Sequence, residues 1–373
     1  MRKRESSIVS LVFLILMFVF GGLYGCRQSQ DDTTEASANK PIKIRIHSQL
    51  PIGHNVTNTI ELFIQEAEKR SNGRLQFIHF PAQQLYKDTQ TLDVISKGTI
   101  EMAQISPSMW AGVVSEMDMS WPTFFNDVDH FYRFLLDVEG GGGYVYKVLD
   151  PILQQKVNTK YIFSAAYELG GLGAIVLTEP CRSLEEFKGR KIRAIGKVSS
   201  LRIKLAGGVP VIMSAGDVYM ALQRGTIEGA ITGCTSWISR KLYEVAKYGF
   251  HLYSSSVGGI FPVVINAHFW NKLPKDLQLI ILEAGKTAEI SSAQQALEIH
   301  EECLVTLKEK GIVTFEASPE EKAMLWAESR PRFIKEMERD MGKSATKMYI
   351  QLAEASKKGT RTWKETCTAR PLH

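Results

Sequence analysis

The chain has 373 residues, of which 44% are hydrophobic and 23% are charged, and its formal net charge is +5 at pH 7. This length allows two α/β lobes that each bury a core, and the composition is ordinary for a soluble globular protein. The positive charge is small and dispersed, without a basic stripe interleaved with aromatic residues, which argues against a nucleic-acid partner.

The N-terminal residues have the pattern of an export signal. A basic start at residues 2–4 precedes an apolar run of 17 residues at 8–24, an order that is typical of such signals. The run ends at Leu23-Tyr24-Gly25-Cys26, which resembles a bacterial lipobox and predicts removal of residues 1–25 and lipidation of Cys26. An uncleaved signal anchor is the alternative, because the run approaches the length of a membrane-spanning helix.

Residues 26–40 are predicted to be a flexible tether. The segment RQSQDDTTEASANK at 27–40 is polar and has no large apolar side chain, so it cannot bury a core. Such a tether keeps a receptor near a membrane partner at a raised effective concentration. We therefore expect a periplasmic, extracytoplasmic domain that is linked to the membrane through the lipid on Cys26.

The first folded segment alternates strands and helices. Strands are predicted at residues 42–47, 75–80 and 101–105, and amphipathic helices at 58–70 and 89–97. This βαβαβ order favours a parallel sheet flanked by helices. Ligands of such sheets bind beyond the carboxyl ends of the strands, which are followed here by residues 47–51, 81–83 and 106–110.

A second alternating segment follows it. A short helix is predicted at residues 184–187 and a strand at 191–195. Asp217 is placed to cap a helix at 218–224, after which a strand is expected at 227–232.

A long helix is predicted from Pro274 to about Lys310, where Gly285 is the only glycine or proline after the first residue. At 1.5 Å per residue it would reach roughly 50 Å, long enough to span both lobes as a strut. The lysines and arginines at residues 343–370 are interpreted as the solvated face of a helix.

Three motifs in the second segment resemble the substrate-binding proteins of tripartite ATP-independent periplasmic (TRAP) transporters, the dicarboxylate-type or DctP-like family. They are EFKGRKIR at residues 186–193, YMALQRGTIEG at 219–229 and KLYEVAKY at 241–248, the last of which is expected to be helical. Shorter similar segments occur in the family's order, and the similarity covers about residues 41–342. These shorter segments are residues 71–75, 80–85, 97–102 and 269–274.

The resemblance implies a two-lobe, periplasmic-binding-protein-like α/β fold with discontinuous lobes and a long helix spanning both. It also implies an extracytoplasmic receptor that binds an organic acid in the cleft and delivers it to membrane-embedded TRAP permease subunits. Lobe I is expected at residues 41–168 and 259–300, lobe II at 169–258 and 301–345, and a C-terminal helix and tail at 346–373.

The resemblance places Arg193 where the family's arginine pairs with the carboxylate of the ligand. The chemistry is suitable, since a planar guanidinium offers two parallel donors to a carboxylate; the alternative is a surface arginine such as Arg190. A second arginine of the family aligns with residues 171–173 (Gly-Leu-Gly), and its asparagine aligns with Thr232. We therefore expect a single anchor, which favours a monocarboxylate with an apolar body over a dicarboxylate or a sialic acid.

The remaining candidates for the site are aromatic and polar residues expected near the cleft, because ligand pockets combine apolar walls with a few polar anchors. For each aromatic residue the alternative is ordinary core packing, and for the acidic one it is a solvated hinge. The aromatic candidates are Trp110, Phe124, Tyr167, Tyr219, Trp237 and Phe261, and the polar ones are Glu168, Ser214 and Thr232.

No motif indicates a metal site, a cofactor or catalysis. The chain lacks HxxxH, HExxH and GxSxG, so neither a zinc site nor a hydrolase is predicted. Cys181, Cys234, Cys303 and Cys367 allow three disulfide pairings, and free buried thiols are favoured.

Two other functions stay open at this point: a ligand sensor of the same fold that signals to a membrane receptor, and a periplasmic enzyme on a binding-protein scaffold. Adjacent genes for two multispanning proteins would favour transport over sensing. Recovery of an unmodified compound from the purified protein would argue against an enzyme.

Overall fold

The computed structural model describes residues 40–118, 124–125, 127–167, 174–252 and 259–372. Within the chain, Pro41–His373 forms one compact unit. The predicted export signal, Cys26 and the tether up to residue 39 lie outside the described residues, as does Glu168. Among the helices of the described part, none combines the length and the apolar character needed to cross a bilayer.

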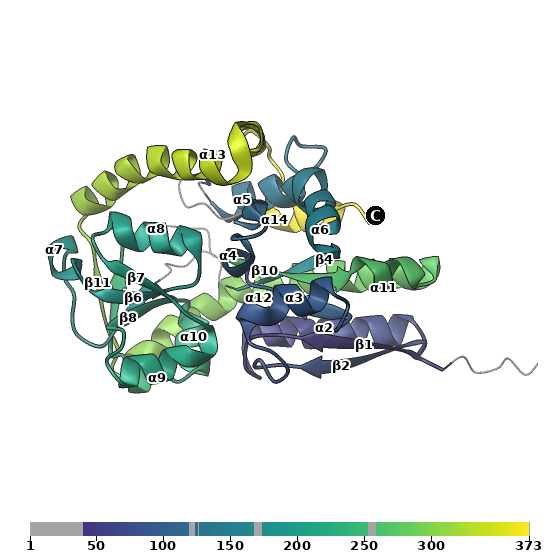
Figure 1. Cartoon of the computed structure of the whole chain (residues 1–373), viewed down its shortest axis with the longest axis horizontal. Coiled ribbons are helices and arrows are strands. Elements are labelled where there is room, and N and C mark those ends of the chain that lie inside the picture. Colours follow the sequence, from purple (N-terminus) through teal and green to yellow (C-terminus); the bar gives the residue numbers. More distant parts are fainter. Residues whose placement is uncertain (1–39, 119–123, 126, 168–173, 253–258, 373) are drawn as a thin grey trace, which may run out of the picture. The chain divides into compact units, whose positions relative to one another are not determined.

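The first sheet, which with its helices is called lobe I below, has the strand order β2-β1-β3-β10-β4 (Figure 1). β1 (Ile42–His47) pairs in parallel with β2 (Leu75–Phe80) and β3 (Met102–Gln104), which confirms the predicted pattern. β10 (Ile260–Asn266) runs antiparallel to both β3 and β4 (Thr159–Ala166), so the sheet as a whole is mixed. Every residue of β4 and β10 is buried, because helices pack against both strands.

The longest of the helices that belong to lobe I alone is α2 (Asn55–Arg70). It begins before the predicted start at Asn58 because the ring of His54 caps it: His54 Nδ1 accepts the N–H of Val56 at 3.1 Å. The other elements are η1 (Asp88–Gln90), α3 (Thr91–Ser96), α4 (Pro107–Trp110), η2 (Ser115–Met117), α5 (Val128–Leu136), η3 (Val145–Leu149), α6 (Asp150–Val157) and α11 (Ala267–Lys272).

The second sheet, which with its helices is called lobe II, has the order β11-β9-β5-β8-β6-β7. β6 pairs in parallel with β7 and β8, whereas β5 is antiparallel to β8 and β9. Because β10 returns to the first sheet and β11 to the second, the predicted two-lobe fold with discontinuous lobes is confirmed. The strands are β5 (Ala174–Leu177), β6 (Lys191–Ala194), β7 (Val209–Ile212), β8 (Gly229–Thr232), β9 (Tyr248–His251) and β11 (Val313–Glu316).

The helices of lobe II are short. Asp217 precedes α9 as predicted, but its side chain makes no capping hydrogen bond. The helix expected at residues 241–248 is wrong except for the single 3-10 turn Leu242–Glu244, and the strand β9, which pairs with β5 and β11, begins at Tyr248. The helical elements are α7 (Leu184–Phe187), α8 (Lys197–Leu205), η4 (Ala215–Asp217), α9 (Val218–Gln223), α10 (Cys234–Ser239) and η5 (Leu242–Glu244).

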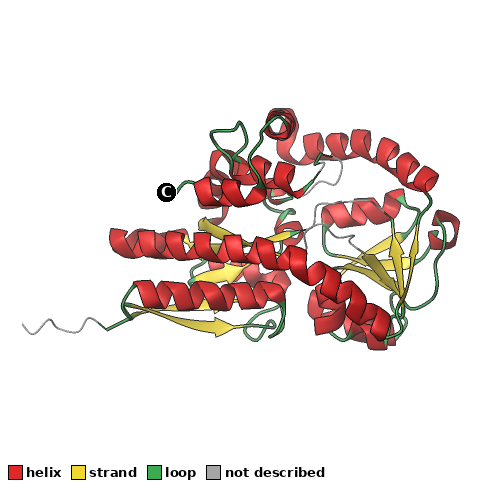
Figure 2. Ribbon diagram, turned by 180° about the vertical axis from the view of Figure 1, so that it is seen from behind, coloured by secondary structure: helices red, strands yellow, loops and turns green. Residues whose placement is uncertain are grey.

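The long helix α12 (Lys275–Glu309) has 35 residues, which confirms the predicted strut. It packs against α2 and β4 of lobe I and against α10 of lobe II, and Figure 2 shows it passing from one sheet to the other. A disulfide between Cys234 and Cys303 ties α10 to α12. The expectation of free thiols is therefore wrong for this pair, whereas Cys181 and Cys367 are free and buried.

The chain ends in α13 (Pro319–Lys357) and α14 (Trp363–Ala369). Gly342 interrupts α13 with φ 83° and ψ 159°, a conformation that glycine adopts without strain. The predicted solvated face is wrong for Arg370, which is buried and pairs with Glu289 of α12 at 2.7 Å. The C-terminal segment is thus anchored to the strut by a buried ion pair.

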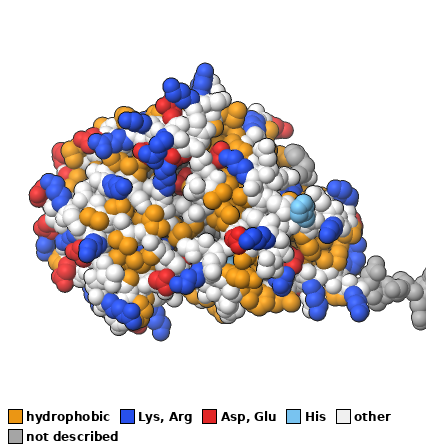
Figure 3. All heavy atoms as spheres, viewed as in Figure 1, with side chains coloured by type: hydrophobic (Ala, Val, Ile, Leu, Met, Phe, Trp, Pro, Cys, Tyr) orange, Lys and Arg blue, Asp and Glu red, His pale blue; other side chains and the backbone are white. Residues whose placement is uncertain are grey.

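On the face shown in Figure 3, lysine and arginine side chains are mixed with aspartate and glutamate and with apolar patches. This face therefore lacks the extended field of one sign that attracts a polyanion.

We expect Arg370→Met to lower the free energy of unfolding by about 3–5 kcal/mol, because it leaves Glu289 buried without its partner. Arg74→Met is the control, since its ion pair with Asp276 is exposed and should be worth about 0–1 kcal/mol. Urea denaturation measures both. Equal losses for the two variants would contradict the assignment of Arg370 as a structural anchor.

Candidate functional site

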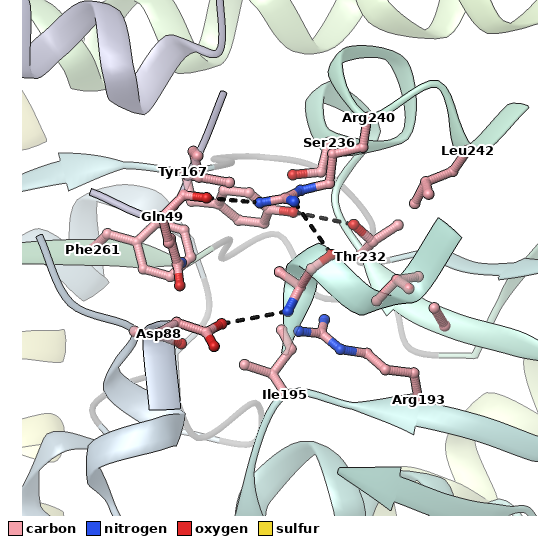
Figure 4. A pocket seen from close by; sticks show the side chains of 15 residues that line it. Gln49, Asp88, Tyr167, Arg193, Ile195, Thr232, Ser236, Arg240, Leu242 and Phe261 are labelled. Carbon is pink, nitrogen blue, oxygen red and sulfur yellow. Dashed lines mark hydrogen bonds between the residues drawn. The ribbon is translucent and has the colours of Figure 1, made fainter. Parts of the chain in front are cut away.

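A cavity lies where elements of the two lobes meet (Figure 4). Residues that follow the carboxyl ends of β1, β3 and β4 contribute to it, in the region that the parallel-sheet argument indicates. Lobe II contributes through β6, β8 and α10 with the residues just after each. The polar, charged and aromatic residues of its lining are Gln49, Asp88, Ser106, Tyr167, Phe261, Arg193, Thr232, Ser236 and Arg240.

Arg193 lies on β6 and is only 5% exposed. Its guanidinium donates to the carbonyl of Met213 through Nε and to the carbonyl of Ile231 through Nη1, each at 3.2 Å. Within the described part of the chain, no carboxylate oxygen comes within 4.0 Å of it. Burial lowers the pKa of Arg193 to about 10, so the group stays charged at neutral pH but is poorly solvated.

Arg240, just after α10, is a second guanidinium in the same cavity. It donates through Nη1 to the carbonyl of Ala215 at 3.2 Å and through Nη2 to the carbonyl of Gln49, in lobe I, at 3.1 Å. Its pKa is lowered, chiefly by burial. The cavity thus has a second cation, which follows α10 and was not among the predicted site residues. The expectation of a single anchor for the ligand stays a prediction, and residues 171–173 lie outside the described residues.

Three predicted site residues, Tyr167, Phe261 and Thr232, line the cavity together with Arg193. The hydroxyl of Tyr167 accepts the N–H of Gly233 at 2.7 Å and lies 3.4 Å from Thr232 Oγ1. Its ring packs edge-to-face on Phe261, with the ring centroids 4.9 Å apart. Tyr167 therefore connects lobe I to the end of β8 in lobe II.

Asp88 of η1 is the acidic residue among those that line the cavity in the described part of the chain. Its Oδ2 accepts the N–H of Ala215 at 3.4 Å. Among the described residues, its Oδ1 is buried without a hydrogen-bond partner, as is the hydroxyl of Ser106 after β3. Asp88 was not among the predicted site residues; its one signal in the sequence is that it follows the loop at the carboxyl end of β2.

The cavity is narrow, with a volume of about 30 Å³, whereas small-molecule sites usually measure roughly 300–1,000 Å³. A neighbouring chamber of about 420 Å³ shares Ala215, Arg240 and Leu242 with it. Ser214 and Tyr219, which were predicted for the site, line this chamber instead. Ser214 donates to Gln83 at 3.0 Å, so hydrogen bonds between the lobes also border the chamber.

The other aromatic candidates occupy the apolar interior. Trp110 and Phe124 lie in the core of lobe I, and Trp237 lies in a core of lobe II, where its Nε1 donates to the carbonyl of Ala246 at 3.2 Å. Ordinary core packing accounts for their positions. Among the described residues, no group of three or more His, Cys, Asp or Glu side chains is arranged to hold a metal ion.

Comparison with known proteins identifies the family. Residues 47–340 match the family model DctP, bacterial extracellular solute-binding protein, family 7. The C4-dicarboxylate-binding periplasmic protein DctP of Rhodobacter capsulatus is 26% identical over 269 residues, which are 71% of this chain and 77% of that protein. A monocarboxylate 2-oxoacid-binding periplasmic protein of Nostoc is 25% identical over 289 residues, which are 75% of each chain.

Solved structures share the fold. A TRAP periplasmic solute-binding protein from Desulfovibrio salexigens with bound orotic acid matches with a TM-score of 0.75 and 19% identity, covering 84% of this chain and 98% of that one. One from Sulfurospirillum deleyianum with bound succinate matches with a TM-score of 0.70 and 24% identity, covering 82% and 97%. The chain belongs to family 7 of the bacterial extracellular solute-binding proteins, which confirms the resemblance to TRAP substrate-binding proteins.

His54 contacts Ser236 and Tyr167, which line the cavity, and bridges the lobes. Its Nε2 lies 3.2 Å from Ser236 Oγ and 3.3 Å from Thr235 Oγ1, and its ring stacks on Tyr167. Burial, helped by the charge of Arg240, lowers the pKa of His54 to about 3. Protonation of Nδ1 would also break the hydrogen bond from Val56 N–H that begins α2.

We expect the free energy of unfolding to fall as the pH drops from about 6.5 towards 4, because unfolded His54 takes up a proton that the folded protein rejects. His54→Gln should flatten this slope by up to about 1.4 kcal/mol per pH unit. Urea denaturation at several pH values measures it, with the exposed His268→Gln as control. Identical slopes in the wild type and His54→Gln would show that His54 is not kept neutral by the fold.

Proposed function

We propose that this protein is an extracytoplasmic receptor that binds an organic acid between Arg193 and Arg240 and delivers it to the permease subunits of a TRAP-type transporter without converting it. The observation that carries the proposal is the pair of guanidinium groups in one cavity, of which Arg193 is buried and Arg240 is partly buried. Their hydrogen bonds go to backbone carbonyls, which are neutral, so their charge is not neutralised by these contacts.

Buried cations of this kind are unfavourable unless an anion joins them. Burial is the chief cause of the lowered pKa values of Arg193 and Arg240, because removal from water disfavours the charged form of each guanidinium. A carboxylate would remove that cost and form charge-assisted hydrogen bonds, which are about twice as strong as neutral ones. The site is therefore suited to an organic anion.

The ligands named for the related proteins are acids as well. The Rhodobacter relative is named for C4-dicarboxylates and the Nostoc relative for monocarboxylate 2-oxoacids. The two solved structures described above hold orotic acid and succinate. These names support a carboxylate as the shared chemistry, while the bodies of the ligands differ widely.

Binding requires the lobes to move. The cavity of about 30 Å³ is too small for an organic acid with a sizeable body, and hydrogen bonds such as Tyr167–Gly233 and Arg240–Gln49 join the lobes around it. An acid that contacts both lobes would favour the arrangement in which they meet, by hinge closure of the kind known for periplasmic binding proteins. A micromolar affinity corresponds to about −8 kcal/mol, so enclosure must add to the ionic contact.

We expect Arg193→Ala to remain folded and to lose at least about tenfold in affinity, because a hydrogen bond to a charged group contributes about 1.5–3 kcal/mol. The matched control is Lys191→Ala, on the same strand but exposed. Calorimetry with an acid that the wild type binds provides the measurement. Unchanged affinity in Arg193→Ala would remove this residue from the site.

The predicted lipid anchor is part of the proposal. We expect the mature protein to begin at Cys26 and to carry lipid, and Cys26→Ser to block incorporation of labelled palmitate. Intact-mass spectrometry of the membrane fraction distinguishes this from the alternative, since an uncleaved signal anchor would retain residues 1–25 and bear no lipid.

A further inference from the structure

Asp88 differs from the other polar residues of the cavity because its carboxylate is buried with one oxygen unused. The residue is 5% exposed, Oδ2 accepts the N–H of Ala215, and Oδ1 has no hydrogen-bond partner within the described part of the chain. A buried acceptor without a donor is unfavourable and is rare in native proteins. Asp88 Oδ1 is therefore suited to accept a hydrogen bond from a ligand.

Arg193 lies across the cavity from Asp88, and Figure 4 shows its guanidinium pointing towards the side on which Asp88 lies. No nitrogen of Arg193 lies within 4.0 Å of a carboxylate oxygen of Asp88, so the two residues form no ion pair. Arg193 donates instead to the carbonyls of Met213 and Ile231. The space between them is bounded by cationic donors on one side and by an acceptor on the other. A ligand that fits this space presents an anionic oxygen at one end and a donor near it.

The charged residues that line the cavity limit the net charge that a ligand can carry. Arg193, Arg240 and Asp88 are the charged residues that line it within the described ranges, so the formal sum is one positive charge. A single carboxylate on the ligand neutralises that sum. A dicarboxylate would leave a negative charge and an amino acid a positive one, and uncompensated buried charge is costly.

We propose, on the basis of the receptor function proposed above, that the ligand is a monocarboxylate carrying an uncharged hydrogen-bond donor, a hydroxyl or an amide N–H, which Asp88 Oδ1 accepts. The arginines hold the carboxylate, and Asp88 determines specificity. Ser106 lines the same cavity, and its buried hydroxyl likewise has no hydrogen-bond partner in the described part of the chain. The ionised carboxylate of Asp88 can accept hydrogen bonds but cannot donate one. A 2-oxo acid presents only a carbonyl oxygen to Asp88, which is also an acceptor, so we expect it to be rejected.

Matched trios of acids test this on the purified protein, first by thermal shift and then by calorimetry. The trios are lactate, pyruvate and propionate; 3-hydroxybutyrate, acetoacetate and butyrate; and mandelate, phenylglyoxylate and phenylacetate, with malate and alanine added to vary the charge. In the trio that binds best, we expect the hydroxy acid to bind about 10- to 100-fold more tightly than its two analogues, the range for a hydrogen bond to a charged group.

Asp88→Ala should reverse the pattern: it weakens binding of the hydroxy acid by that factor and strengthens binding of the unsubstituted acid, because a negative charge leaves the cavity. Asp93→Ala on α3 is the matched control, since Asp93 is exposed and pairs with Lys97. It should leave both affinities unchanged. If Asp88→Ala does not fold, the order of affinities within each trio, measured on the unaltered protein, tests the role of Asp88 by itself.

Equal affinities within a trio, or preferred binding of an oxo acid, malate or alanine, would overturn the role of Asp88 and leave the carboxylate receptor standing. A lack of response to every acid in the panel would instead contradict the proposed receptor function, and this inference with it.

Discussion

Two guanidinium groups in one cavity, Arg193 buried and Arg240 partly buried, form with the nearby carboxylate of Asp88 the constraint on which the account of this protein depends. Backbone carbonyls satisfy the hydrogen bonds of Arg193 and Arg240 but not their charge. An apolar or cationic ligand would leave that charge uncompensated in a medium of low polarity, where it is expensive. This uncompensated charge is the reason for proposing an organic anion as the ligand.

The fold holds both cations through elements that are themselves fixed. Arg193 lies on β6, which pairs with both β7 and β8. Arg240 follows α10, which begins directly after β8 and is tied to the strut α12 by the disulfide between Cys234 and Cys303. Arg240 also donates to Gln49 in lobe I, so the site is assembled from both lobes. Under the proposed function, a ligand held by Arg240 would therefore couple its binding to lobe closure.

Features with a local pattern were predictable from the sequence. The bounds of β1 and β2, the long helix α12 and the cavity position of Arg193 all follow from periodicity, turn residues or the ordered motifs. Contacts between residues far apart in the sequence were not predictable in this way. Arg240 lies in the triplet Ser-Arg-Lys at 239–241, which is typical of an exposed helix end, and only the position of α10 after β8 brings it inside.

Arg370 illustrates the same limit. Its neighbours in sequence predict a solvated face, but it pairs with Glu289, 81 residues away. The pairing of Cys234 with Cys303 likewise depends on the packing of α10 on α12.

The central claim is tested most directly by a crystal structure of the protein with the compound that copurifies with it. The account predicts a carboxylate whose oxygens lie about 2.7–2.9 Å from nitrogens of both Arg193 and Arg240. A bound compound that touches neither guanidinium, with both arginines still bonded only to backbone carbonyls, would contradict it.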